Sequence, residues 1–354
     1  MPRTLVLDRP RQLRLSEQPS RPLRAGEVRL RARLSGISHG TELSLYRGTS
    51  AFTDKVFDRG LRAFVAPHAG SAATYPVMLG YEMASEVVEV APDVTEVKVG
   101  DLVHTGTPHQ EETVLDVAAS LAATYPLVRL ATGERLERAL FISLAAVALQ
   151  TVHDAEIKLG DAVSVHGLGA IGLITMQMCR LEGIQNVLAV DPDPHRRRLA
   201  AGFGATHVLD PTGDTPVGLQ IRELNGGHGV DIAIEVSGSD RGLQGALEAA
   251  GLGATVVAAG FYQGGAANVR LGEEFHHNRL SLIASIGAWG APDRHAPLWD
   301  RRRVMDTATR LLYTDCVSID GLLGRRFPFD QAPSAYRWID EHPRDAVKVA
   351  LTYR

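Results

Sequence analysis

Residues 162–172 read AVSVHGLGAIG, a short apolar run followed by three spaced glycines. The run Ala162–His166 is continuous and rich in valine, which is typical of a parallel strand buried on both faces. Gly167, Gly169 and Gly172 have the spacing GxGxxG, and an apolar helical pattern follows them. A strand, a glycine turn and a helix in this order predict the phosphate-binding turn of a doubly wound α/β fold.

The glycine turn predicts a binding site for a dinucleotide. Gly167 permits the tight turn, Gly169 lets the backbone approach a pyrophosphate, and Gly172 lets the helix pack closely on the strand. The predicted helix covers Ile171–Glu182, and Ala170 and Ile171 at its start are further candidates for the cofactor site. Free backbone N–H groups and the positive end of the helix dipole at this point favour phosphate oxygens.

The strand NVLAV that comes next ends at Asp191, which is 19 residues after Gly172 (191 − 172). A carboxylate in this place accepts hydrogen bonds from the adenosine ribose and repels a 2′-phosphate, so it favours NAD(H) over NADP(H). A helix cap within the sequence DPDP is the alternative role, and the nearby Arg196 could accommodate a phosphate. The ends of later strands add candidates for the same crevice: Val236, Ser237 and Gly260.

Shifts in composition along the 354 residues indicate two domains. Residues 1–135 contain short β-rich runs separated by Gly, Pro and Asp, which favours a small barrel or sandwich. Residues 136–288 alternate helical segments with apolar strands, which predicts an α/β doubly wound parallel sheet, the Rossmann fold. Residues 289–354 are too short for a domain of their own, and we expect them to pack on the N-terminal part.

Charge and composition argue against several classes of partner. The formal net charge of −4 is unsuited to a nucleic-acid-binding protein. We find no apolar stretch that approaches the roughly 18 residues needed to span a bilayer. Two cysteines, Cys179 and Cys316, cannot form a disulfide framework. The sequence therefore predicts a cytoplasmic protein whose partner is a small molecule, with no nucleic acid and no membrane.

A set of short motifs resembles the medium-chain dehydrogenase/reductase superfamily, in its zinc-type alcohol dehydrogenase-like part. The motifs are GISHGTE at residues 36–42, LGYE at 79–82, KVGD at 98–101 and LGD at 159–161. The resemblance covers essentially the whole chain. It implies a β-rich GroES-like catalytic domain together with the Rossmann domain, hydride transfer with NAD(H), and a homodimer.

The zinc ligands of that superfamily are missing from the matching positions. Ser38 or His39 stands where the family has a cysteine, and Tyr81 stands where it has a histidine. Residues 139–150, which should supply a third ligand, contain no Cys, His, Asp or Glu, and residues 94–113 lack the cysteines of the structural zinc lobe. Because zinc requires donors of these kinds, we expect a zinc-free protein, similar to the metal-free branch that includes bacteriochlorophyllide a dehydrogenase.

Without zinc, hydrogen-bond donors have to stabilise the developing alkoxide. The family geometry points Ser38, Thr41 and Tyr81 toward the nicotinamide ring. We therefore predict that Tyr81 and Thr41 bind the substrate oxygen and relay its proton. The expected acid–base support comes from one of three candidates: His39, Glu42 or Glu82. The alternative is that Tyr81 is a packed aromatic residue and Glu82 a buried structural acid. We expect His109 in a surface turn, with a place in the cleft as its alternative.

The leading interpretation is a zinc-independent, NAD(H)-dependent oxidoreductase that interconverts an alcohol and a ketone or aldehyde. Two other interpretations are open. One is a zinc-free reductase of an activated C=C bond, as in the quinone and enoyl reductases of the superfamily, and the other is a dinucleotide-binding protein without turnover. The pair Thr41-Glu42 matches the relay position of alcohol dehydrogenases and favours the first interpretation.

Overall fold

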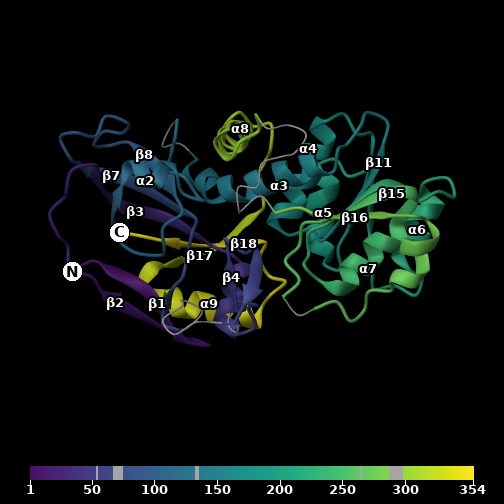
Figure 1. Cartoon of the computed structure of the whole chain (residues 1–354), viewed down its shortest axis with the longest axis horizontal. Coiled ribbons are helices and arrows are strands. Elements are labelled where there is room, and N and C mark those ends of the chain that lie inside the picture. The colour runs from purple at the N-terminus through teal and green to yellow at the C-terminus, as the bar shows by residue number, and fades with distance from the viewer. Residues whose placement is uncertain (53–54, 67–74, 132–134, 264, 287–297) are drawn as a thin grey trace. The chain divides into compact units, whose positions relative to one another are not determined.

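In a computed structural model, the chain forms two compact units (Figure 1). Unit 1 consists of Met1–Leu140 and Leu322–Arg354, and unit 2 consists of Phe141–Gly321. The structure describes residues 1–52, 55–66, 75–131, 135–263, 265–286 and 298–354.

Unit 2 contains a six-stranded parallel sheet with the order β13-β12-β11-β14-β15-β16. Its strands are β11 (Ala162–His166), β12 (Asn186–Val190), β13 (His207–Leu209), β14 (Val230–Glu235), β15 (Ala250–Ala258) and β16 (Ser281–Ala284). The chain runs outward from β11 through β12 and β13, then crosses to β14 on the other side of β11. This reversal of direction is the point at which doubly wound sheets bind ligands. The predicted α/β fold with a parallel sheet is confirmed.

Helices follow most strands of unit 2 (Figure 1). They are α3 (Ile142–Asp154), α4 (Ala170–Leu181), α5 (Pro194–Gly202), α6 (Val217–Leu224), α7 (Asp240–Ala249), η2 (Leu271–Phe275) and α8 (Arg301–Tyr313). Buried side chains of β12, β14, α6 and α7 belong to one core of the sheet, which includes Leu188, Ile221 and Leu247. Burial of such aliphatic groups is the main favourable contribution to folding.

Unit 1 is rich in β-structure. Its strands are β1 (Arg3–Arg9), β2 (Gln12–Glu17), β3 (Glu27–Ile37), β4 (Val56–Asp58), β5 (Ala63–Val65), β6 (Val77–Met78), β7 (Met83–Val90), β8 (Leu102–Thr105), β9 (Glu112–Asp116), β10 (Val128–Arg129), β17 (Leu323–Pro328) and β18 (Lys348–Thr352). Its helices are α1 (Thr41–Arg47), α2 (Val117–Leu121), η1 (Leu136–Phe141), η4 (Phe329–Gln331) and α9 (Ala332–Glu341). A three-stranded sheet has the order β2-β1-β6, and a seven-stranded sheet has the order β10-β8-β7-β3-β18-β17, with β9 also paired to β3.

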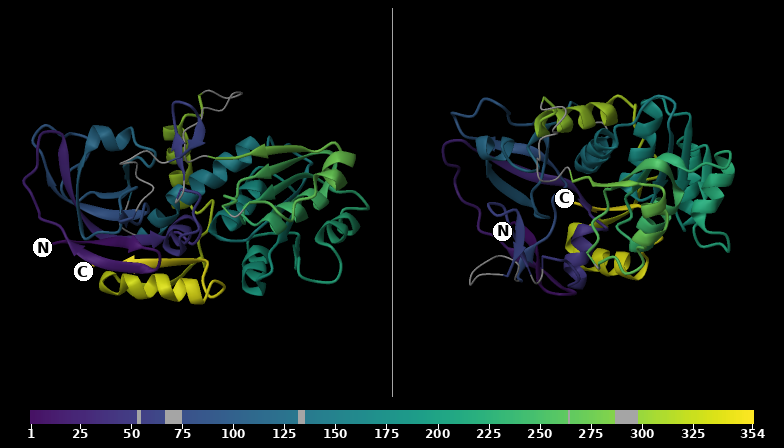
Figure 2. Two further views of the ribbon diagram at one scale, coloured as in Figure 1. Left: turned by 60° about the horizontal axis from the view of Figure 1, so that its bottom comes forward. Right: turned by 45° about the vertical axis from the view of Figure 1, so that its right-hand side comes forward.

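The last strand of the chain completes the larger sheet of unit 1. β18 pairs antiparallel with β3, so that Val349 lies opposite Ile37. Helix α9 contacts β2, β17 and β18 and covers this part of the unit (Figure 2). The C-terminal segment therefore packs on the N-terminal part of the chain, and it places β18 next to the GISHGTE motif.

The end of unit 2 differs from the sequence prediction. The predicted boundary between residues 288 and 289 falls outside the described residues, and unit 2 continues to Gly321. Helix α8 therefore belongs to unit 2, because it packs on α3 and buries Val304 and Leu312. The predicted start at residue 136 likewise differs from the observed start at Phe141.

One helical stretch, Leu136–Asp154, is long and apolar enough to span a membrane by length and composition. It has 19 residues and a mean hydropathy of 1.2. The sequence-based expectation that no stretch approaches this length is therefore wrong. In the structure, 72% of this apolar window is buried inside the protein, which is the position of a core helix.

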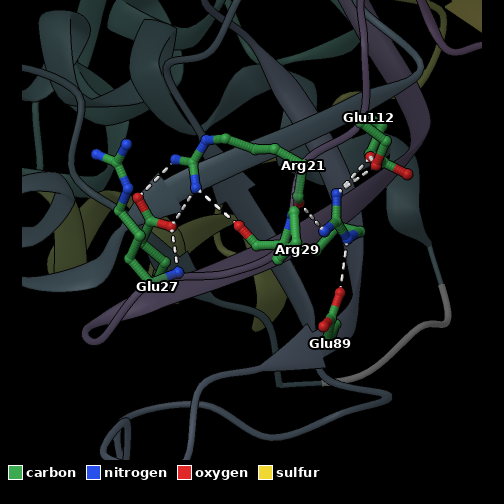
Figure 3. A network of polar contacts seen from close by, with 8 residues as sticks. Arg21, Glu27, Arg29, Glu89 and Glu112 are labelled. Carbon is green, nitrogen blue, oxygen red and sulfur yellow. Dashed lines mark hydrogen bonds and ion pairs between the residues drawn. The ribbon is translucent and has the colours of Figure 1, made fainter.

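Ion pairs connect the start of β3 to the neighbouring strands of unit 1 (Figure 3). The side chain of Arg29 donates to Glu89 over 2.7 Å and to Glu112 over 2.6 Å. Arg21 donates to both carboxylate oxygens of Glu27, over 2.7 and 2.6 Å. The hydrogen bond from Arg21 lowers the pKa of Glu27 to about 2. The segment before β3 is thus attached to β3 by charge-assisted hydrogen bonds, which are stronger than neutral ones.

We predict that the acid sensitivity of unit 1 depends on Glu27. Because its pKa in the folded state is about 2, below the unfolded value of about 4.3, Glu27 stabilises the fold above the unfolded pKa. That contribution is lost as the pH falls toward 2. Glu27→Gln should therefore flatten the loss of thermal stability on acidification, measured by circular dichroism. Glu17→Gln, at an exposed position of β2, is the control and should behave like the unmodified protein. Equal acid dependence of E27Q and the unmodified protein would contradict the assignment.

Candidate active site

The glycine turn after β11 has the conformation that the sequence predicts. Gly167 has a φ of +93°, and a Cβ there would lie 2.7 Å from the backbone N of Ser237. A Cβ on Gly172 would lie 1.8 Å from the carbonyl oxygen of Gly167. A Cβ on Gly169 would meet no described atom within 4 Å. Glycine is thus required at the first and third positions, and the second leaves room for a pyrophosphate at the start of α4.

The carboxylate of Asp191 is buried at the end of β12 and is bonded to the glycine turn. One oxygen accepts the N–H of Leu168 over 2.7 Å, and the other accepts the N–H of Asp193 over 2.8 Å. Asp193 is the cap of α5, since it accepts the N–H of His195 over 2.7 Å. Asp191 is therefore not the helix cap, and its oxygens have further lone pairs for ribose hydroxyls. The guanidinium of Arg196 lies 3.9 Å from Asp191.

The other predicted cofactor residues lie at the carboxyl ends of neighbouring strands. The N–H of Val236 donates to the carbonyl of His166, directly before the glycine turn, over 2.9 Å. The N–H groups of Ser237 and Gly260 donate to Glu235, over 2.7 and 3.0 Å. The ends of β11, β14 and β15 thus meet at one place. The close backbone approaches, the open face at Gly169 and the buried carboxylate of Asp191 all fit a dinucleotide.

Unit 1 contains a buried polar cluster that is centred on Glu42. One carboxylate oxygen of Glu42 accepts the N–H of Ser38 over 2.8 Å. The other oxygen lies 3.0 Å from Nε2 of His109 and accepts the hydroxyl of Tyr336. Nδ1 of His109 lies 2.8 Å from the hydroxyl of Ser35. Burial acts to raise the pKa of Glu42, but His109, Tyr336 and the Ser38 N–H outweigh burial, so the pKa is lowered and Glu42 is ionised.

A second buried acid, Glu82, forms an ion pair with Lys348 of β18. The two side chains are 0% and 2% exposed. Burial raises the pKa of Glu82 to about 7, although Lys348 acts in the opposite direction. Gly36 of β3 lies against this pair, because a Cβ there would be 2.4 Å from the Glu82 carboxylate and 2.7 Å from Cε of Lys348.

Tyr81 is half-buried beside these acids, and its ring stacks on Tyr125 with a centroid separation of 5.1 Å. Burial, and secondly the charge of Glu82, raise the pKa of Tyr81 well above its usual value, whereas a side-chain hydrogen bond with Ser38 acts in the opposite direction. The hydroxyl therefore stays protonated near neutral pH. It is suited to donating a hydrogen bond to an oxygen that gains negative charge.

The structure separates the predicted catalytic residues into two groups. Ser38, Glu42, Tyr81 and Glu82 lie in or beside the buried cluster. His39 is half-buried in the turn before α1, and Thr41, the first residue of α1, is exposed.

Sequence analysis missed several members of the cluster. His109 is 0% exposed, so its prediction as a surface-turn residue is wrong. Its partners Ser35 and Tyr336, together with Lys348, carry no local motif. Lys348 did offer a signal, because it is a single charge inside the apolar run AVKVAL, and a lysine in a buried strand needs a partner.

The donors at this site do not fit a catalytic zinc ion. Ser38 and Tyr81 offer neutral hydroxyls, and the carboxylates of Glu42 and Glu82 are engaged by the partners named above. The ammonium group of Lys348 adds positive charge beside them, which opposes a second cation. Across the part of the chain that the structure describes, no three His, Cys, Asp or Glu residues are grouped to hold a metal. The chemistry of the cluster is that of hydroxyl donors held by buried charges.

Comparison with known proteins agrees with both units. Residues 24–119 match the alcohol dehydrogenase GroES-like domain, and residues 170–299 match the family described as zinc-binding dehydrogenase. The chain is 32% identical to D-guloside 3-dehydrogenase of Escherichia coli (strain K12), over 99% of both chains.

Two solved structures are similar over 99% of both chains. The 2R,3R-butanediol dehydrogenase from Bacillus subtilis has a TM-score of 0.78 at 22% identity. A dehydrogenase described as rspB from E. coli CFT073, complexed with cofactor NADH, has a TM-score of 0.76 at 18% identity. The predicted GroES-like domain is thereby confirmed. The chain therefore belongs to the zinc-type alcohol dehydrogenase-like group of the medium-chain dehydrogenase/reductase superfamily, a family of oxidoreductases that use nicotinamide cofactors.

Proposed function

We propose that this chain is an NAD(H)-dependent dehydrogenase that interconverts a secondary alcohol and a ketone without a catalytic zinc ion. The observation that carries this proposal is the pair of hydroxyls of Ser38 and Tyr81 in the two motifs where the family has zinc ligands, with His39 as the alternative to Ser38 in the first motif. Ser38 acts to lower the pKa of Tyr81, so the two side chains lie near each other. Buried Glu42 accepts the backbone N–H of Ser38, and buried Glu82, paired with Lys348, directly follows Tyr81. In this respect the chain is similar to the metal-free branch that includes bacteriochlorophyllide a dehydrogenase.

The proposed mechanism uses hydrogen bonds in place of metal coordination. A bound NAD(H) supplies or accepts the hydride. Tyr81 stays protonated and donates to the substrate oxygen, and Ser38 binds the same oxygen. Donors that are fixed in place before reaction stabilise the charge that develops on this oxygen, and loss of one such donor costs roughly 10²–10³-fold in turnover.

Proton exchange with the substrate is assigned to the less buried groups. Thr41 is exposed, so it can meet water and substrate. His39 is half-buried two residues before it, with Nε2 shielded from solvent, and we propose that it assists Thr41. Glu42 and Glu82 are almost fully buried, so we propose that their support is indirect and acts through Ser38 and Tyr81. The sequence predicts acid–base support from these acids, and their burial favours support that acts through other side chains.

The proposed substrate class is supported by the name of D-guloside 3-dehydrogenase, one of the proteins to which this chain is similar. D-guloside 3-dehydrogenase acts, by its name, at position 3 of a sugar, and the carbon at that position carries a secondary alcohol. We propose a small polyhydroxylated substrate for this chain. The name of this similar protein describes oxidation at a carbon that carries a hydroxyl group. We therefore prefer oxidation of an alcohol to reduction of a C=C bond as the reaction of this chain.

NAD(H) is the proposed cofactor because the carboxylate of Asp191 lies against the glycine turn and has further lone pairs that can accept hydrogen bonds from ribose hydroxyls.

We also propose a homodimer in the cytoplasm. β16 is an edge strand of its sheet, and Leu282 and Ile286 near this edge are 40% and 52% exposed. An edge strand with apolar side chains is suited to pairing with a second copy.

We predict that Asp191→Asn weakens the preference for NADH over NADPH. The substitution keeps the shape of the side chain and removes the charge that repels a 2′-phosphate. The dissociation constant for NADPH divided by that for NADH, both measured by fluorescence titration, should fall about tenfold, which corresponds to about 1.4 kcal/mol. Asp210→Asn, which alters an acid paired with Arg197 at 3.0 Å, is the control and should leave the ratio unchanged. An unchanged ratio in D191N would remove Asp191 from cofactor discrimination.

We predict that Tyr81→Phe lowers turnover by about tenfold or more while the affinity for NADH is unchanged. The variant keeps the ring that stacks on Tyr125 and removes only the donor to the substrate oxygen. Turnover is measured as NADH formation with a panel of methyl glycosides and polyols. Tyr46→Phe is the matched control, since this buried tyrosine packs on Tyr336 at 5.6 Å and has no proposed contact with substrate. Wild-type turnover in Y81F would exclude the proposed role of Tyr81.

A further inference from the structure

His109 contacts both of the segments that carry the proposed substrate-binding hydroxyls. On one side, its Nε2 lies 3.0 Å from the Glu42 carboxylate, whose other oxygen accepts the N–H of Ser38 over 2.8 Å. A single carboxylate thus lies between the imidazole and the backbone of Ser38. The position of Ser38 depends on where His109 holds Glu42.

On the other side, His109 packs on the backbone that leads into Tyr81. The N–H of His109 donates to the carbonyl of Leu79 over 2.7 Å. A Cβ on Gly80 would lie 2.5 Å from the backbone N and 2.8 Å from Cγ of His109. Gly80 also has a φ of +110°, which glycine adopts without strain. The turn that presents Tyr81 is therefore in direct contact with the histidine.

Nδ1 and the backbone carbonyl of His109 are also hydrogen-bonded. Its Nδ1 lies 2.8 Å from the hydroxyl of Ser35, which in turn lies 2.8 Å from the hydroxyl of Tyr353. Its carbonyl oxygen accepts the N–H of Leu5 over 2.9 Å. The side chain is 0% exposed. With both ring nitrogens and both backbone polar groups bonded, His109 has one orientation available.

We propose that His109 is a positioning residue that sets the spacing between the hydroxyls of Ser38 and Tyr81. The proposal rests on the proposed function, in which both hydroxyls bind the same substrate oxygen. Hydrogen bonds to one oxygen tolerate little error in the placement of their donors, and a misplacement of about 1 Å can cost about 10²-fold in rate. One rigid side chain between the two segments supplies this precision.

Two conservative variants distinguish the bond between Nε2 of His109 and Glu42 from the bond between Nδ1 of His109 and Ser35. In His109→Gln, the amide nitrogen reaches the position of Nε2 and keeps the bond to Glu42. In His109→Asn, the shorter amide reaches the position of Nδ1 and keeps the bond to Ser35 instead. We expect H109Q to keep turnover within about threefold of wild type and H109N to lose about tenfold or more in kcat. The KM should change less than kcat, and the affinity for NADH should not change.

A second measurement reports positioning without any need for turnover. Amide hydrogen exchange of a peptide that covers residues 36–42 should be faster in H109N than in H109Q, because only H109N loses the bond to Glu42. A peptide that covers residues 79–82 should exchange equally in the two variants, because the backbone N–H of residue 109 holds Leu79 in both. Tyr353→Phe removes only the outermost hydroxyl and should leave exchange at both segments close to that of wild type. Thermal melts of each variant identify any general loss of stability, which would speed exchange elsewhere in unit 1 as well.

The outcomes separate this inference from the proposed function. Lower kcat together with faster exchange at residues 36–42 in H109N alone supports the positioning role. Equal kcat and equal exchange in H109N and H109Q, in an active enzyme, would overturn it. If the unmodified protein oxidises no member of the substrate panel while H109N and H109Q still differ in exchange at residues 36–42, positioning by His109 stands and the proposed function fails.

Discussion

The carboxylate of Glu42 is the interaction on which the site in unit 1 depends. A buried charge is costly unless it is paired and hydrogen-bonded, and Glu42 meets this requirement with Ser38, His109 and Tyr336. Glu42 itself lies in α1, and its three partners come from three other places in the sequence: the turn after β3, the segment before β9, and α9. One ionised group therefore fixes the mutual arrangement of elements that are far apart in the chain. Loss of any partner would leave part of the charge unsatisfied.

The pair of Glu82 and Lys348 imposes a comparable constraint beside Tyr81. The lysine comes from the last strand, so the C-terminus of the chain contributes directly to the site. Gly36 permits this contact, because any larger residue there would collide with the pair. The two buried acids differ in their environment: the pKa of Glu42 is lowered by several partners, whereas burial dominates at Glu82 and raises its pKa to about 7. Groups with opposite shifts of this kind are typical of functional sites.

The site in unit 2 could be predicted from the sequence because its determinants are local. The strand, the three glycines and the carboxylate at Asp191 lie within about 30 residues, and each has a signature that follows from backbone geometry. The site in unit 1 could be predicted only in part. The motifs around Ser38 and Tyr81 pointed to it through family resemblance, but nothing near His109 reveals that it is buried against Glu42. Contacts between residues 67 positions apart arise from the pairing of strands, and pattern and propensity do not encode them. The end of unit 2 at Gly321 differs from the predicted end at residue 288 for the same reason, because the packing of α8 on α3 is a tertiary contact.

We propose that hydroxyls held by buried charges replace the catalytic zinc of this family. The most direct test measures the metal content and the turnover of the same purified sample, before and after exhaustive treatment with a strong chelator. If hydroxyls take the place of zinc, the purified protein should contain much less than one zinc ion per chain and keep full NAD-dependent turnover after chelation. One zinc ion per chain, with turnover that disappears on its removal and returns when zinc is added, would contradict it.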